Sequence, residues 1–253
     1  MFEIEGLTKN FGGLTAVDNF TLKIQPNEKV GLIGPNGAGK TTVFNMITGF
    51  LRPTAGKITF LGKDITGSSP HSIARKGIVR TFQLTSVFPN LTVLDNLISA
   101  HNLNLHIGFW EAVLHTKGNR KKEDEIRHKS IEIMEFLGLE EFRDRTAQNL
   151  PHGYKRILGI AIALAAEPRL LLLDEPLTGM NAGEVETAIE LINKIWQSGI
   201  TVLLIEHNMR AAMGLCQRIA VIDFGKKIAE GTPQEVQNNE EVIQAYLGRS
   251  RAA

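Results

Sequence analysis

The residues best suited to do chemistry lie together at positions 34–42, which read Gly-Pro-Asn-Gly-Ala-Gly-Lys-Thr-Thr. This stretch matches the pattern G-x-x-x-x-G-K-[ST], whose glycines let backbone N–H groups surround a polyphosphate without Cβ clashes. Lys40 can reach the β- and γ-phosphates as a point charge, and the Thr41 hydroxyl is a ligand for Mg²⁺. The residues predicted to bind nucleotide here are Gly34, Asn36, Gly37, Ala38, Gly39, Lys40, Thr41 and Thr42.

A phosphate-binding loop needs a strand before it and a helix after it. Residues 29–33 have the composition of a short buried strand, and residues 43–47 continue as an apolar-rich helix. The positive end of that helix dipole points at the same anion. A glycine-rich turn with a chance lysine is the alternative, and it does not account for this context. The sequence predicts a nucleotide site.

Carboxylates and a histidine follow two further strands. Four leucines at 170–173 read as a strand buried on both faces, and Asp174 and Glu175 come directly after them. A second apolar strand, 200–205, ends near His207. Ligands in open α/β sheets bind at the carboxyl ends of the strands, so these groups are candidates for the same site. The alternatives are an acidic helix cap for the carboxylates and a structural role for the histidine.

Composition limits the class of protein. The chain has 253 residues, 43% hydrophobic and 22% charged, with a formal net charge of +1, so charge gives no reason to expect a nucleic-acid partner. A single cysteine, Cys216, excludes an intrachain disulfide and fits a reducing compartment. No signal peptide is visible, and the longest apolar run, 157–166, is too short to cross a membrane. Action at a membrane would require docking onto another chain.

The pattern along the chain predicts one α/β domain over residues 1–253. The first sixty residues are β-rich, with strands at 21–25 and 57–61. Helical spacing dominates a predicted insertion at about 86–167. A capping box at Thr232-Pro233-Gln234-Glu235 opens a helical tail at about 232–248.

Several elements follow one another in a specific order: the phosphate loop, Gln83 after a short strand, residues 150–154 opening an apolar helix, the acid-ended strand, and His207. This order resembles the ATPase subunit of ATP-binding-cassette transporters over essentially the whole chain. The resemblance implies a RecA-like P-loop core with an N-terminal antiparallel β-subdomain and an inserted helical subdomain. It also implies ATP and Mg²⁺ as cofactors.

The resemblance assigns roles at matching positions. Asp174 matches the aspartate that holds Mg²⁺ through water, and Glu175 matches the general base that polarises the attacking water. Gln83 resembles the glutamine that contacts Mg²⁺ and faces the membrane partner; taken alone it would be a solvent-facing side chain. His207 resembles the histidine that contacts the γ-phosphate. Phe11 falls where the family places an aromatic ring that stacks on adenine, with plain core packing as the alternative.

The chain departs from the family pattern twice. The family signature Leu-Ser-Gly-Gly-Gln is here Leu-Pro-His-Gly-Tyr at 150–154, so Pro151 replaces the serine that bonds the γ-phosphate across a dimer. Proline offers neither a hydroxyl nor an N–H, whereas Gly153 and the helix N-terminus remain. We hypothesise that His152 adds a side-chain donor. The second departure is Asn181, where the family usually carries aspartate.

These features look most like the ATPases of branched-chain amino-acid importers and their amide and urea relatives, with the lipopolysaccharide-export ATPase as a neighbouring branch. The resemblance implies ATP hydrolysis coupled to transport. The implied partners are integral-membrane permease subunits, a second ATPase subunit (this chain or a paralogue) and, indirectly, a substrate-binding protein. It places the chain in the cytoplasm, peripheral on the inner face of the cell membrane, with no nucleic-acid partner, and leaves the cargo open.

Two other classes of protein with the same phosphate loop are alternatives. A soluble cassette ATPase acting on nucleic acid or ribosomes is opposed by the single cassette, the lack of a coiled-coil insertion or zinc motif, and the near-neutral charge. A small-molecule kinase would need an acceptor site, which nothing in the sequence suggests.

Overall fold

The computed structural model describes residues 1–81, 87–104, 117–207 and 209–250. The chain divides into two compact units. The first is formed by residues 1–80, 169–178 and 192–253, and the second by residues 81–168 and 179–191. Helix α7 (Ala182–Gln197) begins in the second unit and ends in the first.

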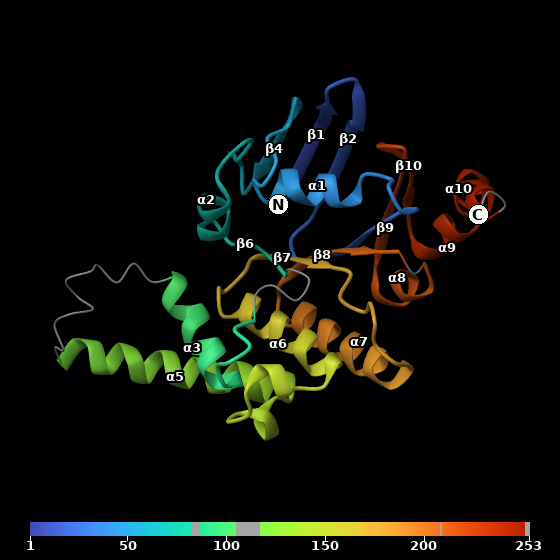
Figure 1. Ribbon diagram of the computed structural model, residues 1–253. Coiled ribbons are helices and arrows are strands. Elements are labelled where there is room, and N and C mark those ends of the chain that lie inside the picture. Colours follow the sequence, from blue (N-terminus) through green and yellow to red (C-terminus); the bar gives the residue numbers. More distant parts are fainter. Residues whose placement is uncertain (82–86, 105–116, 208, 251–253) are drawn as a thin grey trace. The chain divides into compact units, whose positions relative to one another are not determined.

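The first unit contains an antiparallel sheet of four strands in the order β2-β1-β4-β5 (Figure 1). In β2, Leu22 and Ile24 are buried while Lys23 is exposed, so the alternation predicted at 21–25 reflects one buried and one solvated face. The strands are β1 (Phe2–Phe11), β2 (Leu14–Ile24), β4 (Ala55–Phe60) and β5 (Lys63–Asp64).

A second sheet in the same unit has six strands in the order β10-β9-β3-β8-β7-β6. All neighbours pair in parallel except β10 and β9. Because they are parallel, β3, β7 and β8 end at the same edge of the sheet, and residues that follow them are brought together. The strands are β3 (Lys29–Ile33), β6 (Ile78–Arg80), β7 (Leu170–Asp174), β8 (Thr201–Glu206), β9 (Arg218–Asp223) and β10 (Lys226–Gly231).

One hydrophobic cluster joins both sheets to helix α1 (Lys40–Ile47). Phe2 and Phe60 from the antiparallel sheet meet edge to face, with ring centroids 6.4 Å apart. Phe44 of α1 and Leu203 of β8 belong to the same cluster and are fully buried. This core holds α1, and therefore the loop that precedes it, against the ends of the strands.

The described residues of this unit also form helices α2 (Pro70–Arg75), α8 (Met209–Leu215), α9 (Pro233–Gln237) and α10 (Glu240–Ser250). The predicted capping box at the start of α9 is confirmed: Thr232 accepts from the Glu235 N–H at 3.4 Å, and the Glu235 carboxylate accepts from the Thr232 N–H at 2.7 Å. These bonds satisfy backbone donors that the first turn of a helix leaves unpaired.

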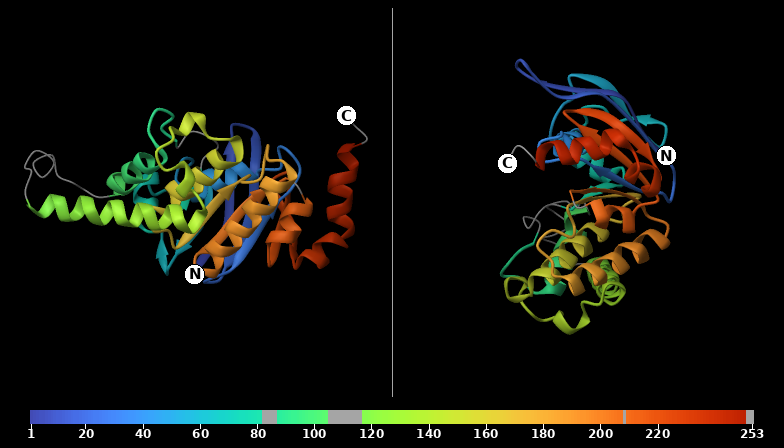
Figure 2. Two further views of the ribbon diagram at one scale, coloured as in Figure 1. Left: turned by 90° about the horizontal axis from the view of Figure 1, so that it is seen from below. Right: turned by 90° about the vertical axis from the view of Figure 1, so that its right-hand side faces the viewer.

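The second unit is helical. Helices α3 (Val93–Asn104), α5 (Lys117–Leu137) and α6 (His152–Leu164) lie side by side in Figures 1 and 2, and short 3₁₀ turns occur at Glu140–Phe142 and Ala147–Asn149. Its interior includes Leu97, Met134 and Leu158, one from each long helix. The apolar run predicted to be a core helix lies largely on α6.

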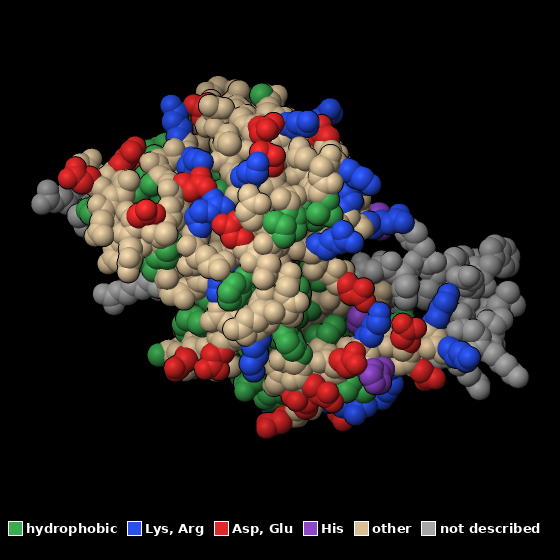
Figure 3. All heavy atoms as spheres, turned by 180° about the vertical axis from the view of Figure 1, so that it is seen from behind, with side chains coloured by type: hydrophobic (Ala, Val, Ile, Leu, Met, Phe, Trp, Pro, Cys, Tyr) green, Lys and Arg blue, Asp and Glu red, His purple; other side chains and the backbone are tan. Residues whose placement is uncertain are grey.

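Within the described residues, every helix is too short or too polar to span a bilayer. On the face drawn in Figure 3, acidic and basic side chains are interspersed over the part of the surface that the structure describes. This distribution is in keeping with the formal net charge of +1.

Candidate nucleotide site

The predicted phosphate loop connects β3 to α1, as its pattern requires. A Cβ at Gly34 would lie 2.0 Å from the carbonyl oxygen of Ile222, so no side chain fits there. Gly39 is the N-cap of α1 with φ at 109°, and a Cβ there would lie 2.7 Å from the carbonyl oxygen of Ala16. Glycine is therefore required at both ends of the loop by close backbone approach, and at Gly39 by conformation as well.

Lys40 is buried in the loop that precedes it. Its ammonium donates to the carbonyl oxygens of Gly34 and Pro35, at 2.6 and 2.9 Å. These bonds give the buried charge polar partners. Phosphate oxygens can replace the two carbonyl oxygens as acceptors from the Lys40 ammonium, because hydrogen bonds to a charged acceptor are stronger than those to a neutral carbonyl.

A cavity of about 330 Å³ opens over this loop. All of the predicted loop residues except Gly34 line it, and Glu175 does so as well. The structure also adds residues that sequence reasoning did not assign to the site. Among the described residues, the lining is formed by Leu14, Thr15, Ala16, Asn36, Gly37, Ala38, Gly39, Lys40, Thr41, Thr42, Glu175 and Phe224.

Two phenylalanines near this site differ in position. Phe11, predicted to stack on adenine, is 47% exposed and does not line the cavity; the Lys9 ammonium lies 5.1 Å from its ring centroid. Phe224 lines the cavity, is 75% exposed, and has φ at 42°. The Phe224-Gly225 turn is recognisable in the sequence, but its position over the loop depends on β9 lying next to β3.

Asp174 lies at the end of β7 and is held by Arg80 of the neighbouring strand β6. The Arg80 guanidinium donates to Asp174 Oδ2 at 2.6 Å and to Asn45 Oδ1 at 2.7 Å. The two charged side chains are only 6% and 11% exposed. Sequence reasoning did not find this pair, because the partners are 94 positions apart.

Glu175 and His207 meet at the carboxyl ends of β7 and β8. His207 Nδ1 lies 3.6 Å from Glu175 Oε2, and the Thr178 hydroxyl donates to the same oxygen at 3.3 Å. Glu175 has φ at 47°, a strained conformation for a residue with a Cβ. Its N–H donates to the carbonyl of Ile205 at 3.0 Å, which holds this conformation and directs the side chain out of the strand.

The signature variant belongs to the helical unit, where Pro151 is the N-cap of α6. Within the described part of the chain no side chain caps this helix end, and a Cβ at Gly153 would lie 2.7 Å from Glu184 Oε1. The His152 ring packs beside Gly179.

Asn181 and Glu184 form a reciprocal pair of hydrogen bonds at the start of α7: each side chain accepts from the backbone N–H of the other residue, at 3.0 Å. Asparagine at 181 therefore caps α7 without a charge. The predicted Gln83 lies outside the described residues.

The family follows from a comparison with known proteins. The sequence profile described as ABC transporter matches residues 17–178, which is more than half of the chain and contains both the phosphate loop and the acid-ended strand. The chain belongs to the ABC transporter family. A second profile, described as branched-chain amino acid ATP-binding cassette transporter, matches residues 226–252, which contain β10, α9 and α10.

Relatives and solved structures extend this match to nearly the full chain. The high-affinity branched-chain amino acid transport ATP-binding protein BraF of Pseudomonas aeruginosa is 43% identical, over 99% of this chain and 98% of that protein. The lipopolysaccharide export system ATP-binding protein LptB of Haemophilus influenzae is 37% identical, over 96% and 95%. The ADP conformation of MJ1267, an ATP-binding cassette of an ABC transporter, superposes with a TM-score of 0.86 at 31% identity, covering 98% of each chain.

These matches confirm the predicted family and the predicted RecA-like ABC ATPase fold, and the chain is an ATPase of this family. Nucleotide binding is accordingly a property of the chain. The roles of individual site residues remain predictions.

Proposed function

We propose that this ABC ATPase powers an importer of branched-chain amino acids or related amides. The observation that carries the proposal is the match of residues 226–252 to the branched-chain amino acid profile. The higher identity to BraF than to LptB, 43% against 37%, supports an importer over the lipopolysaccharide-export branch.

In the proposed mechanism, the ATP phosphates occupy the cavity over the loop. Lys40 exchanges the carbonyls of Gly34 and Pro35 for phosphate oxygens, and the N–H groups at the start of α1 face the same anion. Phe11 stacks on adenine, which would cover a ring that is half exposed without nucleotide.

The residues present fit a magnesium ion. Hard cations take oxygen ligands: the Thr41 hydroxyl in the cavity would hold the ion directly, and the Asp174 carboxylate at the end of β7 would hold it through water. Gln83 is the further ligand implied by the family resemblance. When bound, the ion neutralises phosphate charge. For Asp174 to bind it, the carboxylate must exchange part of its hydrogen bonding to Arg80.

Glu175 is the proposed general base and His207 the proposed contact to the γ-phosphate. Glu175 lines the cavity, so its carboxylate can orient a water molecule toward the terminal phosphate. The 3.6 Å approach of His207 Nδ1 to Glu175 restricts where that carboxylate can turn. Hydrolysis requires both the proton acceptor and this positioning.

The functional assembly is proposed to be a dimer of ATPases docked on integral-membrane permease subunits at the inner face of the cell membrane. The second ATPase is this chain or a paralogue, and a substrate-binding protein delivers cargo to the permease. Pro151, His152 and Gly153 of one subunit face the nucleotide on the other. The uncapped N-terminus of α6 is suited to an anion, and His152 adds a donor beside it.

Glu175→Gln tests the mechanism, because glutamine keeps the size of the side chain but cannot accept the proton. We expect ATP affinity within a few-fold of wild type and hydrolysis slower by about 10²–10⁴-fold. Size-exclusion chromatography with light scattering should then show a dimer that persists with ATP. Turnover close to wild type would exclude Glu175 as the base.

Affinity purification of this variant with ATP, from detergent-solubilised membranes of its own cell, tests the transport function. Permease subunits and a second cassette in the purified material support an importer, and transport assays on that complex name the cargo. Recovery with lipopolysaccharide-export components would favour that branch instead. Purely soluble or nucleic-acid partners, with ATPase activity stimulated by DNA, would replace the transport function by the non-transport alternative.

A further inference from the structure

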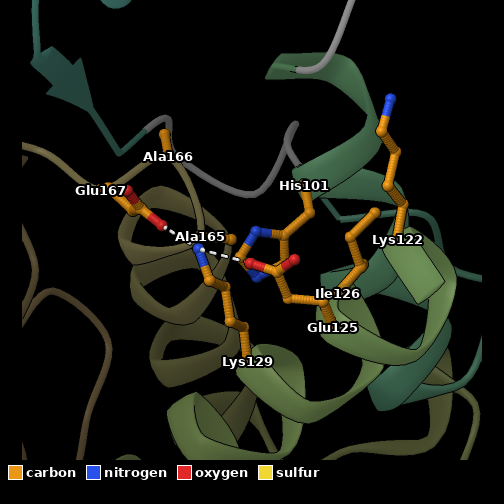
Figure 4. Close-up of a pocket in the computed structure, with 8 residues that line it drawn as sticks. All are labelled: His101, Lys122, Glu125, Ile126, Lys129, Ala165, Ala166 and Glu167. Carbon is orange, nitrogen blue, oxygen red and sulfur yellow. Dashed lines mark hydrogen bonds and ion pairs between the residues drawn. The ribbon is translucent and has the colours of Figure 1, made fainter. Parts of the chain in front are cut away.

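A second cavity lies within the helical unit, among α3, α5 and the end of α6 (Figure 4). Its volume is about 350 Å³, within the range of about 300–1,000 Å³ that is usual for small-molecule sites. It shares no residue with the nucleotide cavity. Its lining is His101, Lys122, Glu125, Ile126, Lys129, Ala165, Ala166 and Glu167.

His101 is the least expected member of this lining. It is only 7% exposed, and its Nε2 atom is buried without a hydrogen-bond partner among the residues that the structure describes. In Figure 4 the imidazole points toward the charged end of Lys129. Burial, aided by the Lys129 ammonium, lowers the pKa of His101 and so favours the neutral ring. A buried polar atom without a hydrogen-bond partner is unfavourable, and an occupant that offers a partner would relieve this cost.

Charged groups converge beside this imidazole. The Lys129 ammonium lies 2.8 Å from Glu167 Oε1 and 3.8 Å from Glu125 Oε1, as the dashed lines in Figure 4 mark. Glu167 follows the end of α6 with φ at 49°, a conformation that glycine usually adopts at this place. Non-glycine residues in this conformation are enriched at ligand sites, where the surroundings hold them in place.

The remaining lining limits the chemistry of an occupant. Lys122 extends away from the cluster in Figure 4, on a flexible stem that can return the ammonium to the mouth of the cavity. With it the described part of the lining carries two lysines and two glutamates, so these residues offer a polyanion no excess of positive charge. Ile126, Ala165 and Ala166 supply an apolar wall. A ligand that matches this set has both charges and a small apolar group.

We propose that this cavity binds a free α-amino acid with an aliphatic side chain. The ammonium group of the ligand takes the place that the Lys129 ammonium holds between the carboxylates of Glu125 and Glu167, and Lys129 turns toward the ligand carboxylate. The carboxylate accepts from the ammonium groups of Lys122 and Lys129, the side chain packs on the apolar wall, and His101 Nε2 bonds to the polar end.

The test uses the purified full chain with L-leucine as the probe, by isothermal titration calorimetry and by ligand-observed NMR. We expect saturable binding of one leucine per chain that persists when the nucleotide cavity is filled with ADP. Isoamylamine, which lacks the carboxylate, and 4-methylpentanoate, which lacks the ammonium, should each bind at least about tenfold more weakly, since each loses one charge-assisted interaction. Equal or tighter binding of either analogue overturns the proposal, as does the absence of saturable leucine binding.

Substitutions of lining residues test whether leucine binds in this cavity. Glu125→Gln alters an exposed carboxylate without threatening the fold and should weaken leucine binding about tenfold, and Glu132→Gln on the same helix is its control. His101→Gln should weaken binding as well, with the exposed His128→Gln as its matched control. Unchanged affinity in Glu125→Gln and His101→Gln would place leucine elsewhere and refute the site.

If the chain powers uptake of such amino acids, this cavity would sense the transported product inside the cell. That extension rests on the proposed function, whereas binding to the isolated chain does not. If the isolated chain binds leucine but the purified complex does not transport amino acids, the proposed function is refuted and the site is not. If the complex transports amino acids but the isolated chain does not bind leucine, only the site is refuted.

Discussion

The buried pair between Arg80 and Asp174 gives a quantitative test of how the nucleotide site is built. The guanidinium donates to Asp174 at 2.6 Å and to Asn45 at 2.7 Å, and it lies 5.5 Å from the ring centroid of Phe44. Replacing Arg80 with Gln removes the positive charge and leaves the Asp174 carboxylate buried beside a neutral side chain. We expect this change to destabilise the nucleotide-free protein strongly.

The magnitude follows from burial. Removing one partner of a buried ion pair costs about 3–5 kcal/mol, because the remaining charge loses its counter-charge and is not returned to water. Glutamine can keep one hydrogen bond, so we expect the lower end, about 3 kcal/mol. At roughly 2–4 °C per kcal/mol for a chain of this size, the melting temperature should fall by about 6–12 °C.

The assay is thermal unfolding followed by circular dichroism in EDTA without nucleotide, repeated with Mg²⁺ and ATP. Lys23→Gln is the control, because its pair with Glu3 at 3.3 Å is exposed and worth about 0–1 kcal/mol. A double variant with Asp174→Asn should recover most of the loss. Mg²⁺ with ATP should stabilise Arg80→Gln more than wild type, since the ion then compensates the carboxylate. Equal losses for Arg80→Gln and Lys23→Gln would refute the reasoning.

Three further predictions use single positions. Gly34→Ala should abolish binding of a fluorescent ATP analogue, because its Cβ would lie 2.0 Å from the carbonyl oxygen of Ile222; near-normal affinity would contradict the loop geometry. Asn181→Ala should lower the free energy of unfolding by about 1 kcal/mol through loss of the cap to Glu184, whereas Asn181→Asp should preserve it, as urea titration can show. Burial raises the pKa of the Cys216 thiol to about 12, so iodoacetamide should label the folded chain far more slowly than the unfolded chain at pH 8.5. As the pH rises above 9, the thiol ionises in the unfolded chain but not in the folded chain, so the free energy of unfolding should fall. Rapid labelling of folded protein, followed by mass spectrometry, would show that the thiol is accessible.

Much of the nucleotide site could be predicted because its parts are contiguous in sequence. The pattern at 34–42 requires the strand before it and the helix after it, and both are present as β3 and α1. The four leucines before Asp174 predicted a strand buried on both faces, and β7 is one. In each case the residues that specify the element are the residues that form it.

Other features depend on which elements become neighbours. Arg80 meets Asp174 only because β6 pairs with β7, and Phe224 reaches the cavity only because β9 lies beside β3. Side-chain type gave no sign of either contact: an arginine at the end of a short strand and a phenylalanine in a turn are common in any α/β protein.

The sequence by itself therefore determined the phosphate loop, the acid-ended strand and the family. Only the tertiary structure decided which side chain holds the Asp174 carboxylate, and that His101 is buried beside Lys129 in a cavity of its own. The physical reason is that short spacings along a chain are set by helix and strand geometry, which is local. Contacts between distant segments are set by strand order and core packing, to which many weak interactions contribute at once.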